Sequence, residues 1–112
     1  MDAPERIGMS SAKPPASKPL AGIRVLTLDA ADAFDRGERC DPQAGMAKYF
    51  SSEAALENSI ESMRIHGAYG YSKEYDIERL YRDAPLTCIG EGTNEMQRII
   101  IARQWIKRHA VL

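Results

Sequence analysis

Apolar residues recur at helical spacing through the middle of the chain, and they predict one long helix over about residues 41–66. Asp41 followed by Pro42 is a strong helix start, because aspartate caps free N–H groups and proline fits the first helical position. The face expected to pack comprises Ala47, Phe50, Ala54, Leu56, Ile60 and Met63. The pattern is typical of a core helix in an α-helical bundle.

Residues 23–36 carry a more ambiguous pattern. Ile23 to Leu28 is rich in β-branched residues and is compatible with a short strand. The same stretch also suits a helix that ends at Gly37 and places Leu28, Ala31 and Phe34 on one side. The alanines between residues 29 and 34 favour the helix, which we expect from about Ile23 to Arg36.

Two turns divide the remainder of the chain. Residues 67–71 hold Gly67 and Gly70, which allow positive φ angles and a close approach of the backbone to a ligand, although most such turns only connect helices. Residues 74–83 then predict a shorter helix, which Pro85 is expected to stop.

The last helix is expected to begin at Thr93, which is a good N-cap, with Glu95 in its first turn. Its apolar residues fall on two edges. One edge holds Met96, Ile99, Ile100 and Ile106, and the other holds Ile101 and Trp105. A helix that is apolar on two sides is usually buried between layers or subunits. These elements together predict an all-α helical bundle over residues 21–112.

Residues 1–20 differ in composition from the rest, since they hold four of the six prolines together with serine, alanine and lysine. Such a segment buries too little apolar surface to offset the entropy cost of ordering it, so we expect a flexible arm. It also lacks the apolar region of a secretory signal, which favours a cytoplasmic protein.

Composition excludes several classes of function. The chain has 112 residues and a net charge of −1, which argues against a nucleic-acid surface. No apolar run reaches the roughly 20 residues that a membrane helix needs. Cys40 and Cys88 have neither CxxC spacing nor clustered histidines beside them, so we expect free thiols and no metal site.

The candidate for chemistry is Glu91, which stands between Gly90 and Gly92 directly before the predicted cap Thr93. Neither neighbour carries a side chain that would shield the carboxylate. The adjacent helix N-terminus would stabilise the anion, whereas burial would raise the pKa of the carboxyl group. Glu91 is therefore a candidate general base, but spacing alone favours a solvated corner between two helices.

Three ordered stretches resemble the C-terminal helical domain of the acyl-CoA dehydrogenases, a family of flavoenzymes. They read AGMAKYFSSEAA at residues 44–55, RIHGAYGYSKEYDIERLYRDA at 64–84 and IGEGTNEMQRIIIARQ at 89–104. The resemblance runs from about Asp29 to the end. Arg64 stands where many members have glutamine, and Ala68 stands where glycine is usual.

The resemblance implies a reaction and a set of site residues. In this family a glutamate removes the α-proton of an acyl-CoA thioester, a β-hydride passes to FAD, and electrons leave through an electron-transfer flavoprotein. That glutamate corresponds to Glu91. Thr93 and Glu95 fall where the family contacts FAD, and Gly67 and Gly70 belong to a loop that approaches the FAD of a neighbouring subunit.

The family's enzymes are several times longer than this chain, which leads to two hypotheses. The chain either completes an enzyme whose other domains are supplied elsewhere, or is a non-catalytic module for oligomerisation or binding. In both cases we expect homo-oligomers or a complex with the missing domains, and no FAD on the isolated chain. Separately, residues 18–26 weakly resemble the start of family III CoA-transferases.

Overall fold

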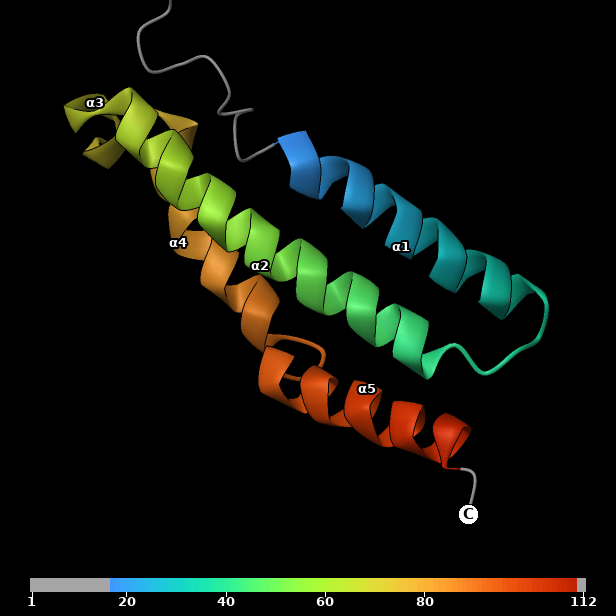
Figure 1. Cartoon of the computed structure of the whole chain (residues 1–112). Helices are drawn as coiled ribbons and strands as arrows, with labels where there is room; N and C mark the ends of the chain where they lie inside the picture. The colour runs from blue at the N-terminus through green and yellow to red at the C-terminus, as the bar shows by residue number, and fades with distance from the viewer. Residues whose placement is uncertain (1–16, 111–112) are drawn as a thin grey trace, which may run out of the picture.

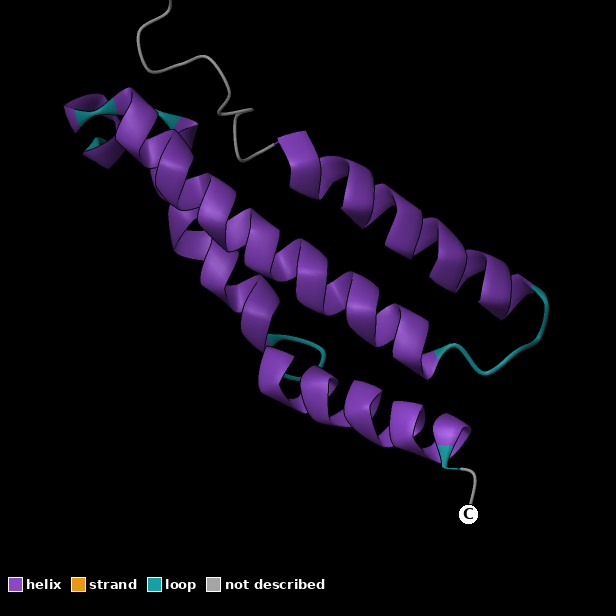
Figure 2. Cartoon of the chain, in the orientation of Figure 1, coloured by secondary structure: helices purple, strands orange, loops and turns teal. Residues whose placement is uncertain are grey.

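A computed structural model describes residues 17–110, which form five helices and no strand within that range. The helices are α1 (Ser17–Asp35), α2 (Asp41–His66), α3 (Ala68–Tyr71), α4 (Asp76–Ile89) and α5 (Asn94–His109). Figures 1 and 2 show α1, α2 and α4 lying side by side, with short loops joining the helices. The predicted all-α bundle is confirmed, and the strand alternative for residues 23–28 is wrong.

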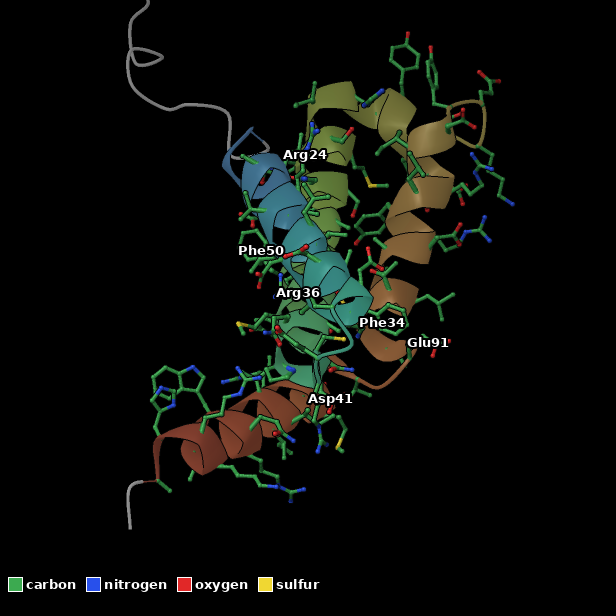
Figure 3. All side chains as sticks on the ribbon, turned by 90° about the vertical axis from the view of Figure 1, so that its right-hand side faces the viewer. Arg24, Phe34, Arg36, Asp41, Phe50 and Glu91 are labelled. Atoms are coloured by element: carbon green, nitrogen blue, oxygen red, sulfur yellow. The ribbon has the colours of Figure 1, made fainter. Side chains whose placement is uncertain are left out.

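Helix α2 is the centre of the arrangement. Helices α1, α4 and α5 each pack on it, and no comparable contact joins α1 to α4 or α5. Helix α1 runs antiparallel to α2 on one side and α4 packs on the other side (Figure 1), while α5 turns at a steep angle to the other long helices and packs on α2 (Figure 3). The turn between α4 and α5 therefore lies against the first half of α2, where Lys48 and Ser52 contact it.

Small residues mediate the helix contacts. The buried apolar residues of the described chain are Ala33, Ala54, Ile77 and Ala84. At Gly45 of α2, an added Cβ would lie 3.0 Å from Gln97 Oε1 and 3.3 Å from Ile101 Cγ1 on α5. The absence of a side chain at Gly45 thus allows α5 to approach α2 closely.

Large apolar side chains remain at the surface. Phe34 is 71% exposed and Ile65 is 84% exposed, and no large side chain of the described residues is completely buried. On α5, Met96, Ile99, Trp105 and Ile106 are all exposed. Many exposed large apolar side chains on one helix favour an interaction surface there.

The starts of α1 and α4 and the cap of α2 differ from the prediction, with α4 beginning at Asp76 rather than Glu74. Helix α1 begins at Ser17 rather than Ile23, so residues 17–20 are helical and do not belong to an arm; residues 1–16 lie outside the described part. Proline 19 is tolerated because the N–H groups of a first turn have no intrahelical partner. In α2, Cys40 rather than Asp41 is the N-cap, because the Asp41 carboxylate pairs with Arg39 instead of the backbone.

The prediction that Pro85 stops its helix is wrong, since α4 continues through it to Ile89. Proline inside a helix removes one backbone hydrogen bond and costs about 3 kcal/mol. Burial of Ile77 and Ala84 fixes α4 on α2 on the N-terminal side of the proline. Beyond it, Cys88 Sγ donates to Ser52 O of α2. Packing on both sides of Pro85 therefore stabilises the helix despite the lost bond.

Candidate functional site

Glu91 lies in the break between α4 and α5, in a turn of residues 90–93 that we call the Glu91 turn (Figure 3). Its φ angle is 57°, and it is the one non-glycine residue with positive φ in the described range. Only a few per cent of non-glycine residues adopt this left-handed conformation, with asparagine, aspartate and histidine preferred. A glutamate held there is therefore strained, and such strain is concentrated at functional sites.

The start of α5 follows directly and is capped as predicted. Thr93 Oγ1 accepts a hydrogen bond of 3.2 Å from Met96 N, and Gln97 N donates to Thr93 O at 3.0 Å. Glu95 is exposed in the first turn of α5. The cap fixes where α5 begins, and so how far the Glu91 turn extends.

Two side chains hold the carbonyl groups of the turn. Gln97 Nε2 donates to Glu91 O at 3.0 Å. Lys48 Nζ of α2 donates to Gly92 O at 2.8 Å, to Cys88 O at 3.2 Å and to Asn94 Oδ1 at 2.6 Å. The backbone on both sides of Glu91 is thus fixed by α5 and by α2.

Next to the turn is a polar cluster of buried Ser52, buried Asn94 and exposed Glu53. Asn94 is only 2% exposed. Its Nδ2 donates to Ser52 Oγ at 2.9 Å and to Glu53 Oε1 at 2.8 Å, and its Oδ1 also accepts from the Lys48 ammonium group. Helical periodicity does not single out Lys48, Ser52 or Asn94. The one signal in the sequence is the i, i+4 spacing of Lys48 and Ser52 on α2.

A surface groove of about 560 Å³ opens beside the turn. Its lining includes Glu91, Lys48 and Gln97 together with Arg39 and Arg103. Glu91 itself is exposed, so a substrate brought to this groove would meet its carboxylate directly. Both acidic side chains (Asp41 and Glu91) and basic ones (Arg39, Lys48 and Arg103) line the groove, which suits a polar ligand with anionic parts.

The second predicted element, the glycine turn of residues 67–70, lies at the opposite end of α2. Gly67 has φ +61°, and no atom lies within 4 Å of the position its Cβ would take. Gly70 is buried, and a Cβ there would lie 2.8 Å from Met63 O. Gly67 thus presents open backbone, whereas Gly70 is required for packing.

The structure does not bring the two predicted elements together. Lys48, which contacts the Glu91 turn, is nineteen residues before Gly67 on the axis of α2. At about 1.5 Å per residue the separation is roughly 28 Å. Glu91, Thr93 and Glu95 therefore form one site, and Gly67 and Gly70 belong to another surface of the same chain.

The backbone strain at Glu91 should be relieved by a glycine at this position. Glu91→Gly should raise the free energy of unfolding by about 1 kcal/mol, because glycine adopts the left-handed conformation without a Cβ clash. Urea denaturation monitored by circular dichroism measures the change. Glu95→Gly, within α5, is the matched control and should instead destabilise the chain. Unchanged or lower stability of Glu91→Gly would show that the turn carries no such strain.

Comparisons with known proteins agree with this arrangement. The family described as "Acyl-CoA dehydrogenase, C-terminal domain" matches residues 18–106. The chain is 50% identical over 80 residues to an acyl-CoA dehydrogenase of Bacillus subtilis, covering 71% of this chain and 21% of that protein. It is 46% identical over 88 residues to a 3-(aryl)acrylate reductase of Clostridium sporogenes, covering 79% of this chain and 23% of that protein.

A solved structure shows the same fold. Butyryl-CoA dehydrogenase of Megasphaera elsdenii superposes with a TM-score of 0.77 at 35% identity, over 80% of this chain and 23% of that one. The chain therefore spans about a quarter of the length of the relatives it matches. The matched region begins at residue 18, inside α1, so the weak resemblance of residues 18–26 to CoA-transferases is unsupported and the dehydrogenase resemblance starts earlier than predicted.

No helix in residues 17–110 is at once long enough and apolar enough to cross a lipid bilayer. The helical bundle, the Glu91 turn before α5 and the match over residues 18–106 all indicate the same protein family. The chain belongs to the family of FAD-dependent acyl-CoA dehydrogenases and corresponds to its C-terminal domain.

Proposed function

We propose that this chain provides the C-terminal helical part of an enzyme that oxidises acyl-CoA thioesters, with Glu91 as the catalytic base. The observation that carries the proposal is the strained, left-handed backbone of an exposed glutamate at the edge of a groove. A solvated helix corner has no need of a non-glycine residue in that conformation, because glycine would relieve the strain.

The chemistry required of Glu91 is the removal of the α-proton of the thioester. The carboxylate accepts this proton while a hydride leaves the β-carbon, and the product is a 2-enoyl-CoA. FAD, when bound, supplies the acceptor for the hydride. The contribution of this chain is to hold the carboxylate in place, which Gln97 and Lys48 support by fixing the carbonyl groups of Glu91 and Gly92.

The cofactor contacts proposed for this chain are Thr93 and Glu95 at the start of α5, and Gly67 in the glycine turn, whose backbone the buried Gly70 holds against α2. The open backbone at Gly67 is compatible with a flat ring lying against it. The roughly 28 Å between the two surfaces, from the rise of α2, means that they would contact different parts of a cofactor or two separate cofactors. This supports an assembly in which more than one chain shapes each site.

The proposed partners are acyl-CoA, an electron-transfer flavoprotein and a further polypeptide. The relatives include a subunit of the caffeyl-CoA reductase-Etf complex of Acetobacterium woodii, 37% identical over 89 residues. The exposed apolar side chains of α1 and α5 support association with a second copy or with the other domains of such an enzyme.

The purified chain should be colourless and self-associated, because neither candidate surface encloses a flavin and large apolar side chains are exposed. Absorbance between 350 and 500 nm measures bound flavin, and sedimentation or light scattering measures mass. A yellow protein with stoichiometric flavin, or a monomer at micromolar concentration, would contradict these expectations.

Co-expression tests the catalytic proposal directly. The chain is produced together with the part of the Bacillus subtilis acyl-CoA dehydrogenase that lies outside the matched region, and oxidation of acyl-CoA is followed with an artificial electron acceptor. Activity is expected only when both are present. A complex that binds flavin yet does not turn over would instead favour a non-catalytic module, an alternative motivated by the short span of this chain relative to its relatives.

A further inference from the structure

We propose that Lys48 is the positioning residue of the Glu91 turn: its ammonium group ties the end of α4, the turn and the start of α5 to α2 and thereby sets the conformation of Glu91. A lysine on a helix surface usually extends its ammonium group into solvent. Here the ammonium group faces three protein oxygens, at 2.8 Å from Gly92 O, 3.2 Å from Cys88 O and 2.6 Å from Asn94 Oδ1.

The number of acceptors matches the number of donors. A lysine ammonium has three N–H groups and no acceptor, so three bonds satisfy it completely. Each acceptor lies in a different element: Cys88 in the last turn of α4, Gly92 in the Glu91 turn and Asn94 in the first turn of α5. One cation therefore joins three consecutive segments that the backbone links only through the bonds Gly90 N to Leu86 O and Gln97 N to Thr93 O.

The charge of Lys48 also suits its location. Carbonyl groups at the end of a helix carry partial negative charge, which favours a cation at the C-terminus of α4. The partner Asn94 is kept in place by Ser52 and Glu53 of α2, so the third acceptor is itself fixed. A neutral side chain of equal length at residue 48 would leave two carbonyl groups and one amide oxygen without this donor.

The consequence for Glu91 follows from its position between the fixed groups. Gly92 O is held by Lys48 and Glu91 O by Gln97. Without Lys48, the peptide after Glu91 can rotate, and the residue can leave its left-handed conformation for a less strained one. Lys48 acts on catalysis only if Glu91 is the base, as proposed above, whereas its effect on the conformation of the turn does not depend on that function.

Lys48→Met tests the positioning role, because methionine keeps an unbranched chain and removes the ammonium group. Lys73→Met, at an exposed lysine, is the control for loss of one positive charge. NMR of the full chain without cofactor measures the strong intraresidue amide–Hα NOE of Glu91, which reports positive φ. It also measures amide hydrogen exchange across the chain.

In Lys48→Met the NOE of Glu91 should weaken, and exchange in residues 90–94 should rise about tenfold or more while the interior of α2 changes little, because only local opening is affected. Lys73→Met should match the wild type. An unchanged NOE and unchanged exchange in residues 90–94 would overturn the proposal. A uniform rise across all helices would also overturn it, because it would indicate a general loss of stability.

A second measurement covers the case in which Lys48→Met does not fold. In the wild-type chain, the Lys48 ammonium group should exchange its protons with water more slowly than the ammonium group of Lys73. Equal exchange rates for the two lysines would refute the three-bond arrangement.

In the co-expressed complex, Lys48→Met should lower kcat and alter its pH profile with little change in KM. Failure of the wild-type complex to turn over would count against the proposed function alone.

Discussion

Glu91→Gln is expected to reduce acyl-CoA oxidation by the assembled enzyme by at least about 10²–10⁴-fold, the usual contribution of a general base. Glutamine keeps the size and backbone preference of the residue but cannot accept the α-proton. The measurement is the kcat of the co-expressed complex with an acyl-CoA substrate and an artificial electron acceptor. Bound flavin, followed by its absorbance, should be unchanged.

The matched control is Glu95→Gln, which removes a carboxylate four residues away, in the exposed first turn of α5. Glu95 is a proposed cofactor contact, so its replacement is expected to weaken flavin binding while leaving the proton transfer intact. Full turnover in Glu91→Gln, with flavin bound, would remove Glu91 from the role of base. The separation of the two readouts distinguishes loss of the base from loss of the cofactor.

Asn94→Ala is expected to lower the free energy of unfolding by about 2–3 kcal/mol, because it removes the several hydrogen bonds that a buried asparagine makes. Asn94 is 2% exposed and bonds to Lys48, Ser52 and Glu53. Alanine also leaves a cavity at the junction of α2 and α5. Since this chain buries few large side chains, a loss of that size would remove a large part of its stability.

Urea denaturation followed by circular dichroism measures this loss. Asn58→Ala, at a half-buried asparagine on α2, is the matched control and should change stability by no more than about 0.5 kcal/mol. If Asn94→Ala were as stable as Asn58→Ala, the polar cluster would not hold α5 on α2. The comparison separates the stability contributed by the hydrogen bonds of Asn94 from the general cost of truncating an asparagine.

Local sequence signals predicted the helices well where they depend on neighbouring residues. The extent of α2, its end at Gly67 and the cap at Thr93 follow from nearby side chains, and all three are confirmed. Pro85 was misjudged because its effect depends on contacts with α2 that are distant in the sequence. The predicted start of α1 is too late because composition assigns residues 17–20 to the arm, although a proline is compatible with a first helical turn.

The candidate site was predictable only in part, for the same reason. Glu91 stands out in the sequence because glycines flank it and a cap follows. Its left-handed backbone conformation depends on the fold, and the three bonds of Lys48 each span 40 residues or more of chain. Such pairings arise from tertiary packing, and neither helical periodicity nor composition carries information about them.

The central position of α2 has a consequence for how the chain opens. Because α1 contacts α2 but makes no comparable contact with α4 or α5, its detachment breaks only one interface. Opening of the chain is then expected to occur helix by helix rather than all at once, with exchange of α1 amides independent of exchange near Asn94. A transient loss of α1 would expose one side of α2 for another chain while the Glu91 turn stays folded on its opposite side.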